Sequence, residues 1–304
     1  MSRKIVPIVL TLVAVLVFFV VMVLVVQAIN PDLQLGDTAL LRFLFVALGL
    51  VIAFGVYYVT RDSHIWVVGT REVVYMAIGA ALYAVFSYLF NGSVFVVPSV
   101  SQVALRPAIA IPMFFGFAFG PAVGLFTGAV GNMFGDALTG FGLSPQWSVG
   151  NGLVGMIAGL VFLFKDKKKS IDTVLIISAV LTLLVTAIFF LNQDTTNQMY
   201  FASTEPVSLL MGLSIVIGFI IVLVVRFAFG KNVEIAAAVT WSTLGLLIGL
   251  GFAAISDIWI NGYSPVVAIV GEFLPAAGPD LIFAAILVPI LVVAYASIQR
   301  QTGR

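Results

Sequence analysis

Charged and amide side chains are rare in this chain, and those able to bind a small molecule lie in a few short stretches. The first is RPAIAIPMFFGFAFGPAVGLFTGAVGNMFGDALTGFG, which runs from Arg106 to Gly142 and contains Asn132 and Asp136. Because residues four apart share one face of a helix, Asn132 and Asp136 are expected to lie one above the other. Together they predict a polar wall of a binding pocket.

Three further stretches add polar groups that suit a flat heterocycle. GLSPQWSVGNGLVG, SDIWINGYSP and GEFLPAAGPD each combine amides or carboxyl groups with tryptophan or proline. An indole ring offers a stacking face, and a few polar groups fix a ligand's orientation. The predicted substrate-binding residues are Arg106, Asn132, Asp136, Gln146, Trp147, Asn151, Asp257, Trp259, Asn261 and Glu272.

Plainer interpretations of these residues stay open. Trp147 suits an aromatic belt at a membrane interface, and Arg106 could extend its side chain to lipid headgroups. Asp136 could be an interfacial carboxylate solvated by water. The sequence does not decide whether Arg106 and Asp136 pair with each other or with a ligand.

Several classes of chemistry are excluded by composition. Cysteine is absent and histidine occurs once, at His64, so thiolate catalysis and multi-histidine metal sites are ruled out. No Ser/His or Cys/His pairing supports an enzyme, and no phosphate-binding Gly-x-x-x-x-Gly-Lys-Ser/Thr loop supports ATP hydrolysis. The net charge of +1 disfavours nucleic acid as a partner. We therefore predict no enzyme activity, no metal and no cofactor.

The elements that position these residues must be membrane helices. Of 304 residues, 62% are hydrophobic and 9% are charged, which is more apolar surface than a soluble domain of this size can bury. A span needs about 20 apolar residues. The sequence predicts an all-α polytopic membrane protein with about ten spans: 5–29, 39–60, 71–91, 104–118, 120–139, 148–164, 172–192, 207–229, 233–256 and 268–298.

The charges predict the orientation of these spans. With the N-terminus in the cytoplasm, 12 of the 14 Lys and Arg residues lie inside, and only Arg42 and Arg106 lie near the outer face. Both termini are then cytoplasmic. The first apolar run is too long for a signal peptide and is expected to be a retained helix.

Two segments contain proline or glycine residues that affect helix geometry and packing. The span 104–118 is too short to cross the bilayer alone, and Pro112 is expected to kink or break it, as at many transport sites. In the next span, Gly124 and Gly128 begin a glycine stripe. Such a stripe allows close helix packing, either inside the chain or as a sliding surface for a partner subunit.

These motifs resemble a known family. RPAIAIPMFFGFAFGPAVGLFTGAVGNMFGDALTGFG, followed by WSVGNGLVGMIAG, is similar to the substrate-binding S component of energy-coupling-factor (ECF) importers of vitamins and micronutrients. The resemblance is strongest over 71–164, recurs over 233–298, and implies a six-helix core. The expected units are 1–70 (a transmembrane hairpin), 71–170 (core helices 1–4), 171–231 (an inserted hairpin) and 232–304 (core helices 5–6).

The resemblance also implies partners and a mechanism. The core captures a vitamin-like molecule at the outer face of a prokaryotic plasma membrane. It then tilts against a transmembrane coupling subunit while two cytosolic ATPases power release. The Ala-x-x-x-Ala pattern of the first core helix fits Ala77 and Ala81, or Ala80 and Ala84. The two extra hairpins depart from the family pattern and put standard docking in doubt.

A second function class remains. In an ion-coupled secondary transporter, buried acids would relay protons or bind Na⁺. The candidate acids are Asp136, Asp257, Glu272 and Asp280. Their predicted position near the outer face, away from the middle of the membrane, favours the binding subunit. Riboflavin, thiamine or a pterin-like compound would suit the aromatic and amide groups, and no residue set selects among them.

Overall fold

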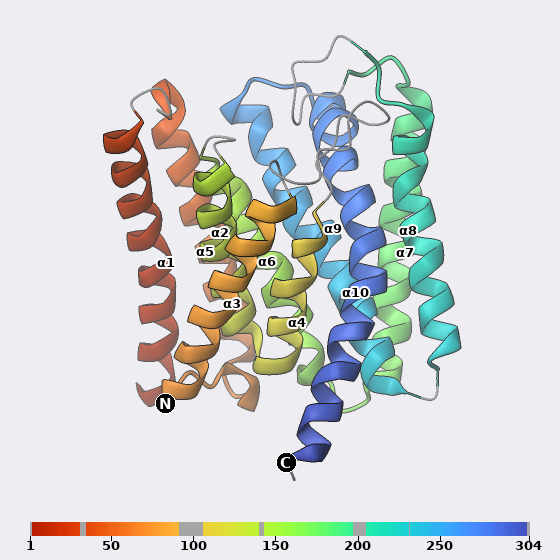
Figure 1. The fold of residues 1–304 in the computed structure, drawn as a ribbon. Helices are drawn as coiled ribbons and strands as arrows, with labels where there is room; N and C mark the ends of the chain where they lie inside the picture. Colours follow the sequence, from red (N-terminus) through yellow and green to blue (C-terminus); the bar gives the residue numbers. More distant parts are fainter. Residues whose placement is uncertain are drawn as a thin grey trace.

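The computed structural model describes residues 2–30, 35–90, 106–139, 143–196, 205–230 and 232–302, and side chains from Ile5 onward. Ten α-helices lie in these ranges (Figure 1). They are α1 Ser2–Ile29, α2 Ala39–Thr60, α3 Thr70–Tyr88, α4 Ala110–Phe119, α5 Pro121–Thr139, α6 Pro145–Gly159, α7 Lys167–Leu191, α8 Leu209–Ala228, α9 Val233–Ile260 and α10 Leu274–Gln301. Seven apolar segments are long enough to cross a membrane, which confirms the all-α polytopic prediction.

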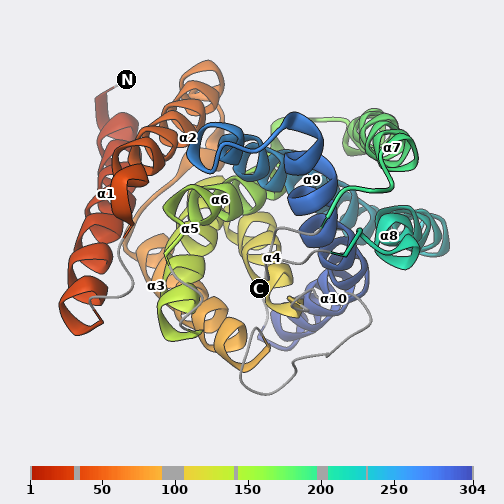
Figure 2. The ribbon, with the colours of Figure 1, turned by 90° about the horizontal axis from the view of Figure 1, so that it is seen from above.

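Six helices form a central bundle. In it, α5 packs between α3 and α6, α6 packs on α9, and α9 packs on α10, while the short α4 contacts α5, α6 and α10 (Figure 2). The most apolar stretch of α6 is 83% buried and that of α9 is 67% buried, against 22–33% for α1, α2, α7, α8 and α10. The centre of the protein therefore runs along α6 and α9.

Two helical hairpins lie against the outside of this bundle. The α1–α2 hairpin packs on α5 and α6, and the α7–α8 hairpin packs on α9 and α10. Large apolar side chains such as Leu24, Val51 and Leu183 are more than half exposed on their outer faces, as expected of surfaces that contact lipid. This packing fits the predicted division at 70, 170 and 231, which stays a prediction.

The glycines of α5 mediate packing inside the chain. A Cβ atom on Gly124 would collide with the carbonyl oxygen of Gly155 in α6, and one on Gly128 would collide with that of Asn151. Further along, Gly131 and Gly135 pack closely on α3. The interpretation of Gly124 and Gly128 as a docking surface is therefore corrected, because both are buried against α6 and no partner can reach them.

The segment before α4 contains the expected irregularity, but Pro112 does not cause it. Residues Pro107–Ile109 form a 3₁₀ turn, and the α-helix begins only at Ala110. Pro112 thus lies in the first helical turn, where its missing N–H has no carbonyl to meet and the ring is tolerated. The structural transition falls at the junction of the two helix types, directly after Arg106.

The two ends of the bundle differ in charge. The start of α1 and the end of α10 lie at the same end, together with the basic loops around Arg61, Lys167 and Arg226 (Figure 1). The opposite end holds the start of α4, the end of α5, the start of α6 and the end of α9. The predicted binding residues are carried by these four helix ends and the start of the last helix.

Candidate functional site

An amide network joins α3, α5 and α6 at the end of the bundle opposite the chain termini. The Tyr83 hydroxyl donates to Asn151 Oδ1 at 2.8 Å and lies 3.4 Å from Asn132 Oδ1. The Asn132 amide nitrogen donates to Asp136 Oδ2 at 2.8 Å and to Ser148 Oγ at 3.1 Å. All five residues are buried, so the one-turn spacing of Asn132 and Asp136 produces a direct hydrogen bond.

Charged groups from three elements meet beside this network, and we call Arg106, Asp136 and Asp280 the Arg106 cluster. Arg106 precedes the 3₁₀ turn, Asp136 is near the end of α5, and Asp280 is in the second turn of α10. The Arg106 guanidinium is 4.0 Å from Asp136 Oδ1 and also interacts electrostatically with Asp280. Arg106 and Asp136 therefore do pair with each other.

Asp280 differs from its neighbours because it accepts no hydrogen bond. Its side chain is 1% exposed, and neither carboxyl oxygen has a hydrogen-bond partner among the described residues. A buried polar group without a partner is rare in native proteins and needs an explanation. In a membrane segment such a group marks a candidate functional site.

A second charged cluster lies on the other side of α6, and we call Arg42, Gln146, Asp257 and Glu272 the Arg42 cluster. Arg42 of α2 donates to Gln146 Oε1 at 3.2 Å, and Gln146 Nε2 donates to Asp257 Oδ1 at 3.1 Å. The Trp147 indole donates to Asp257 Oδ2 at 2.7 Å. This hydrogen bond connects Trp147 of α6 to α9, and it explains the position of the indole ring without a ligand-stacking role.

Glu272 completes the Arg42 cluster from a π-helical stretch, Val267–Phe273, that precedes α10. Its carboxyl group interacts directly with Asp257, and its Oε2 atom has no hydrogen-bond partner among the described residues. In the loop before this stretch, burial raises the pKa of the Tyr263 hydroxyl, and the nearby carboxylates of Glu272 and Asp257 raise it further. Tyr263 therefore stays neutral beside these acids.

Two predicted binding residues lie outside both clusters. Trp259 is 58% exposed on α9 and contacts the Phe45 ring at a centroid distance of 5.7 Å. Asn261 is the exposed residue at which α9 ends. The other eight predicted residues divide between the Arg106 side of α6 and its Arg42 side. That the ten residues bind substrate stays a prediction.

Four residues of the amide network and the two clusters were absent from the predicted site: Tyr83, Ser148, Arg42 and Asp280. Tyr83 is a tyrosine within the apolar stretch MAIGAALYAVF, and Arg42 is the one charged residue of its hairpin helix. Asp280 was noted only as a possible ion-coupling acid. Within the described ranges, no three His, Cys, Asp or Glu side chains gather closely enough to hold a metal ion.

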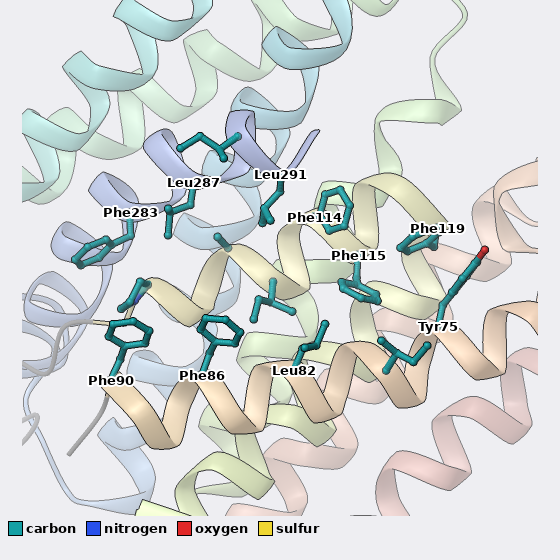
Figure 3. A pocket seen from close by; sticks show the side chains of 15 residues that line it. Tyr75, Leu82, Phe86, Phe90, Phe114, Phe115, Phe119, Phe283, Leu287 and Leu291 are labelled. Atoms are coloured by element: carbon teal, nitrogen blue, oxygen red, sulfur yellow. The ribbon is translucent and has the colours of Figure 1, made fainter. Parts of the chain in front are cut away.

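An apolar groove lies between α3, α4 and α10 (Figure 3), and Pro107, which follows Arg106 in the sequence, is one of its lining residues. Its volume is about 630 Å³, and its walls are almost entirely aliphatic and aromatic. The labelled side chains that line it are Tyr75, Leu82, Phe86, Phe90, Phe114, Phe115, Phe119, Phe283, Leu287 and Leu291. Neither hairpin covers this face (Figure 2).

The Ala-x-x-x-Ala pattern fits two alanine pairs in α3, of which one pair is exposed and the other is buried. Ala77 and Ala81 are exposed, on the side of α3 that also carries the groove residues Ile78 and Leu82. Ala80 and Ala84 are buried in the bundle. Of the two candidate registers, only the exposed pair is accessible to a partner.

Comparison with known proteins adds an independent line of information. The chain matches the family profile described as ECF-type riboflavin transporter, S component, over residues 67–225, slightly more than half of its length. Similar curated proteins include UPF0397 proteins of Vibrio atlanticus (39% identical over 90 residues), Aliivibrio fischeri strain MJ11 (38% over 90) and Streptococcus pneumoniae strain Hungary19A-6 (32% over 90).

Each of these matches covers 30% of this chain and 47% of the relative, so the chain spans about half the length of the curated relatives it matches. No solved structure matches the chain significantly. The family profile covers α3 to α7 and most of α8, which includes Arg106, Asp136 and the amide network. By this match the chain belongs to the family of ECF-type riboflavin transporter S components.

Proposed function

We propose that this protein is the membrane-embedded, substrate-binding subunit of an ECF-type importer. It captures a vitamin or related micronutrient at the outer face of a prokaryotic plasma membrane. The observation that carries the proposal is the Arg106 cluster with its amide network. A transporter of this family needs a buried polar site at one end of the bundle, and these residues provide one.

The orientation follows from the charges. Basic loops lie at the end of the bundle that holds both chain termini, and the polar clusters lie at the other end. The positive-inside rule assigns the basic end to the cytoplasm. The Arg106 cluster then faces outward, where an importer first meets its substrate.

The proposed mechanism requires a transmembrane coupling subunit and two cytosolic ATPases. The face formed by α3, α4 and α10 is the proposed docking surface for the coupling subunit. It is left uncovered by both hairpins, carries the exposed pair Ala77 and Ala81, and contains the apolar groove. Small side chains allow a partner helix to approach, and the end of the groove near Tyr75 and Phe119 accepts its larger apolar side chains (Figure 3).

The first test of this function is the identity of any bound molecule. The protein is purified in detergent from cells grown in rich medium and denatured, and released small molecules are identified by mass spectrometry. A stoichiometric micronutrient is the expected result. In proteoliposomes, uptake driven by an ion gradient without ATPases would contradict the proposal and indicate a secondary transporter.

The docking surface has its own test with a matched control. Ala81→Trp places a large ring on the exposed side of α3 and is expected to reduce co-purification with a co-expressed coupling subunit severalfold. Val180→Trp is the control, because Val180 is 59% exposed on the α7 surface, away from the groove. Equal co-purification of the two variants would contradict docking at α3.

A further inference from the structure

The charge balance of the Arg106 cluster carries an inference about the substrate, and it rests on the function proposed above. The cluster contains one guanidinium group and two carboxylates, all at most 7% exposed. Arg106 lies between Asp136 and Asp280 and can balance only one of them. Because burial disfavours an unpaired carboxylate, Asp280 is ionised there only when a further hydrogen-bond donor or cation approaches its oxygens.

The neighbouring hydrogen-bond donors do not compensate Asp280. The Asn132 amide nitrogen is used by Asp136 and Ser148, and the Tyr83 hydroxyl is directed to Asn151. The Asn151 amide nitrogen donates to the main-chain oxygen of Trp147 at 2.9 Å. Because the surrounding amides are occupied, both oxygens of Asp280 remain available as acceptors.

The unpaired oxygens of Asp280 favour one kind of ligand group. A cationic nitrogen or a group with two N–H donors would satisfy both oxygens and stabilise the carboxylate. A phosphate or carboxylate ligand brings no such donors and would add negative charge beside Asp136 and Asp280. We propose that Asp280 binds a protonated or N–H-rich nitrogen group of the substrate, which is therefore a nitrogen base.

The body of this ligand has an apolar surface next to it. Pro107, which follows Arg106, and Phe283, one helical turn beyond Asp280, both line the upper end of the groove. Asp280 shares its face of α10 with Leu287, seven residues further along. A heteroaromatic ring bearing the nitrogen would contact these side chains while its charged group meets Asp280.

The test uses full-length purified protein and three groups of free vitamins as probes. Thiamine and pyridoxamine carry cationic nitrogens, riboflavin is an uncharged ring system, and pantothenate is an anion. The shift in unfolding temperature and the affinity by calorimetry are measured for each probe. The molecule released from the protein by denaturation is identified in parallel.

We expect the native ligand, and at least one probe, to belong to the cationic or N–H-rich group. Asp280→Asn is expected to lower its affinity at least about tenfold, because a hydrogen bond to a charged group is lost. Asp280→Glu should restore part of it. Asp194→Asn, which changes an exposed aspartate in a loop, is the matched control and should have no effect.

The outcomes separate this inference from the proposed function. A bound anion, a native ligand in the uncharged group such as riboflavin, or binding that Asp280→Asn leaves unchanged in a correctly folded protein would overturn the nitrogen-base assignment while the binding function stands. An empty purified protein that responds to none of the three probe groups would contradict the binding function itself and, with it, this inference. Size-exclusion chromatography of each variant verifies that the fold is retained.

Discussion

Two buried clusters with the same ingredients lie on opposite sides of α6, and their hydrogen bonds differ. The Arg42 cluster and the Arg106 cluster each contain one arginine and two carboxyl groups. In the first, both oxygens of Asp257 accept hydrogen bonds, from Gln146 and Trp147. In the second, Asp280 accepts none from the described residues.

This difference is the one expected between a structural connection and the proposed binding site. The Arg42 cluster joins the added hairpin helix α2 to α6 and α9, so its hydrogen bonds are used within the fold. The Arg106 cluster joins core helices only and keeps acceptors available. Composition alone would assign the two clusters the same role, and only the hydrogen-bond partners distinguish them.

The largest effect on stability is expected from Asp257→Ala. The substitution leaves the Gln146 and Trp147 donors without their acceptor and removes a negative charge near Arg42, which should cost about 3 kcal/mol of unfolding free energy. Denaturant unfolding in detergent measures it. Asp280→Asn serves as the comparison and should not lower stability, because the Asp280 oxygens have no hydrogen bond from the described residues to lose. Equal losses in both variants would erase the distinction between the clusters.

A smaller effect is expected from Arg42→Gln. It removes the hydrogen bond to Gln146 and the charge that faces Asp257 and Glu272, so the α1–α2 hairpin should be held less firmly, at a cost of about 1–2 kcal/mol. Unfolding and limited proteolysis of the hairpin loop measure it. Arg300→Gln, at an exposed position near the end of α10, is the control. An unchanged hairpin would show that packing of α2 on α6 is sufficient by itself.

The smallest effect is expected from Trp259→Ala. Although the sequence places Trp259 among the binding residues, the ring is 58% exposed and contacts Phe45 at the surface. Ligand affinity should remain unchanged, and stability should change by less than about 0.5 kcal/mol. A large loss of affinity would mean that the substrate extends beyond the Arg106 cluster to the end of α9.

Much of the architecture could be predicted from sequence because hydropathy and length dominate the folding of membrane helices. All ten predicted spans correspond to helices, and the boundaries differ by a few residues. The position of the 3₁₀–α junction before α4 was not predictable, because Pro112 is compatible both with a kink and with a first turn. Local chemistry allowed both structures.

The site was predicted in part. Asn132 and Asp136 were found because their spacing fixes a shared helical face, and this relation is local. Tyr83 and Asp280 join them from α3 and α10, through contacts between residues far apart in sequence. The glycines at 124 and 128 illustrate the same limit, because their spacing allows close packing without naming the partner helix.

The sequence by itself determined that the protein lies in a membrane, that it is helical, and where the polar residues stand along each helix. These properties depend on composition and local periodicity. The tertiary structure decided which polar residues meet and which of them remain without partners. Two clusters of the same composition differ because Asp257 accepts hydrogen bonds from Gln146 and Trp147 of α6, whereas Asp280 accepts none from the described residues. Hydrogen bonding is short-range and directional, so this distinction depends on the packed bundle.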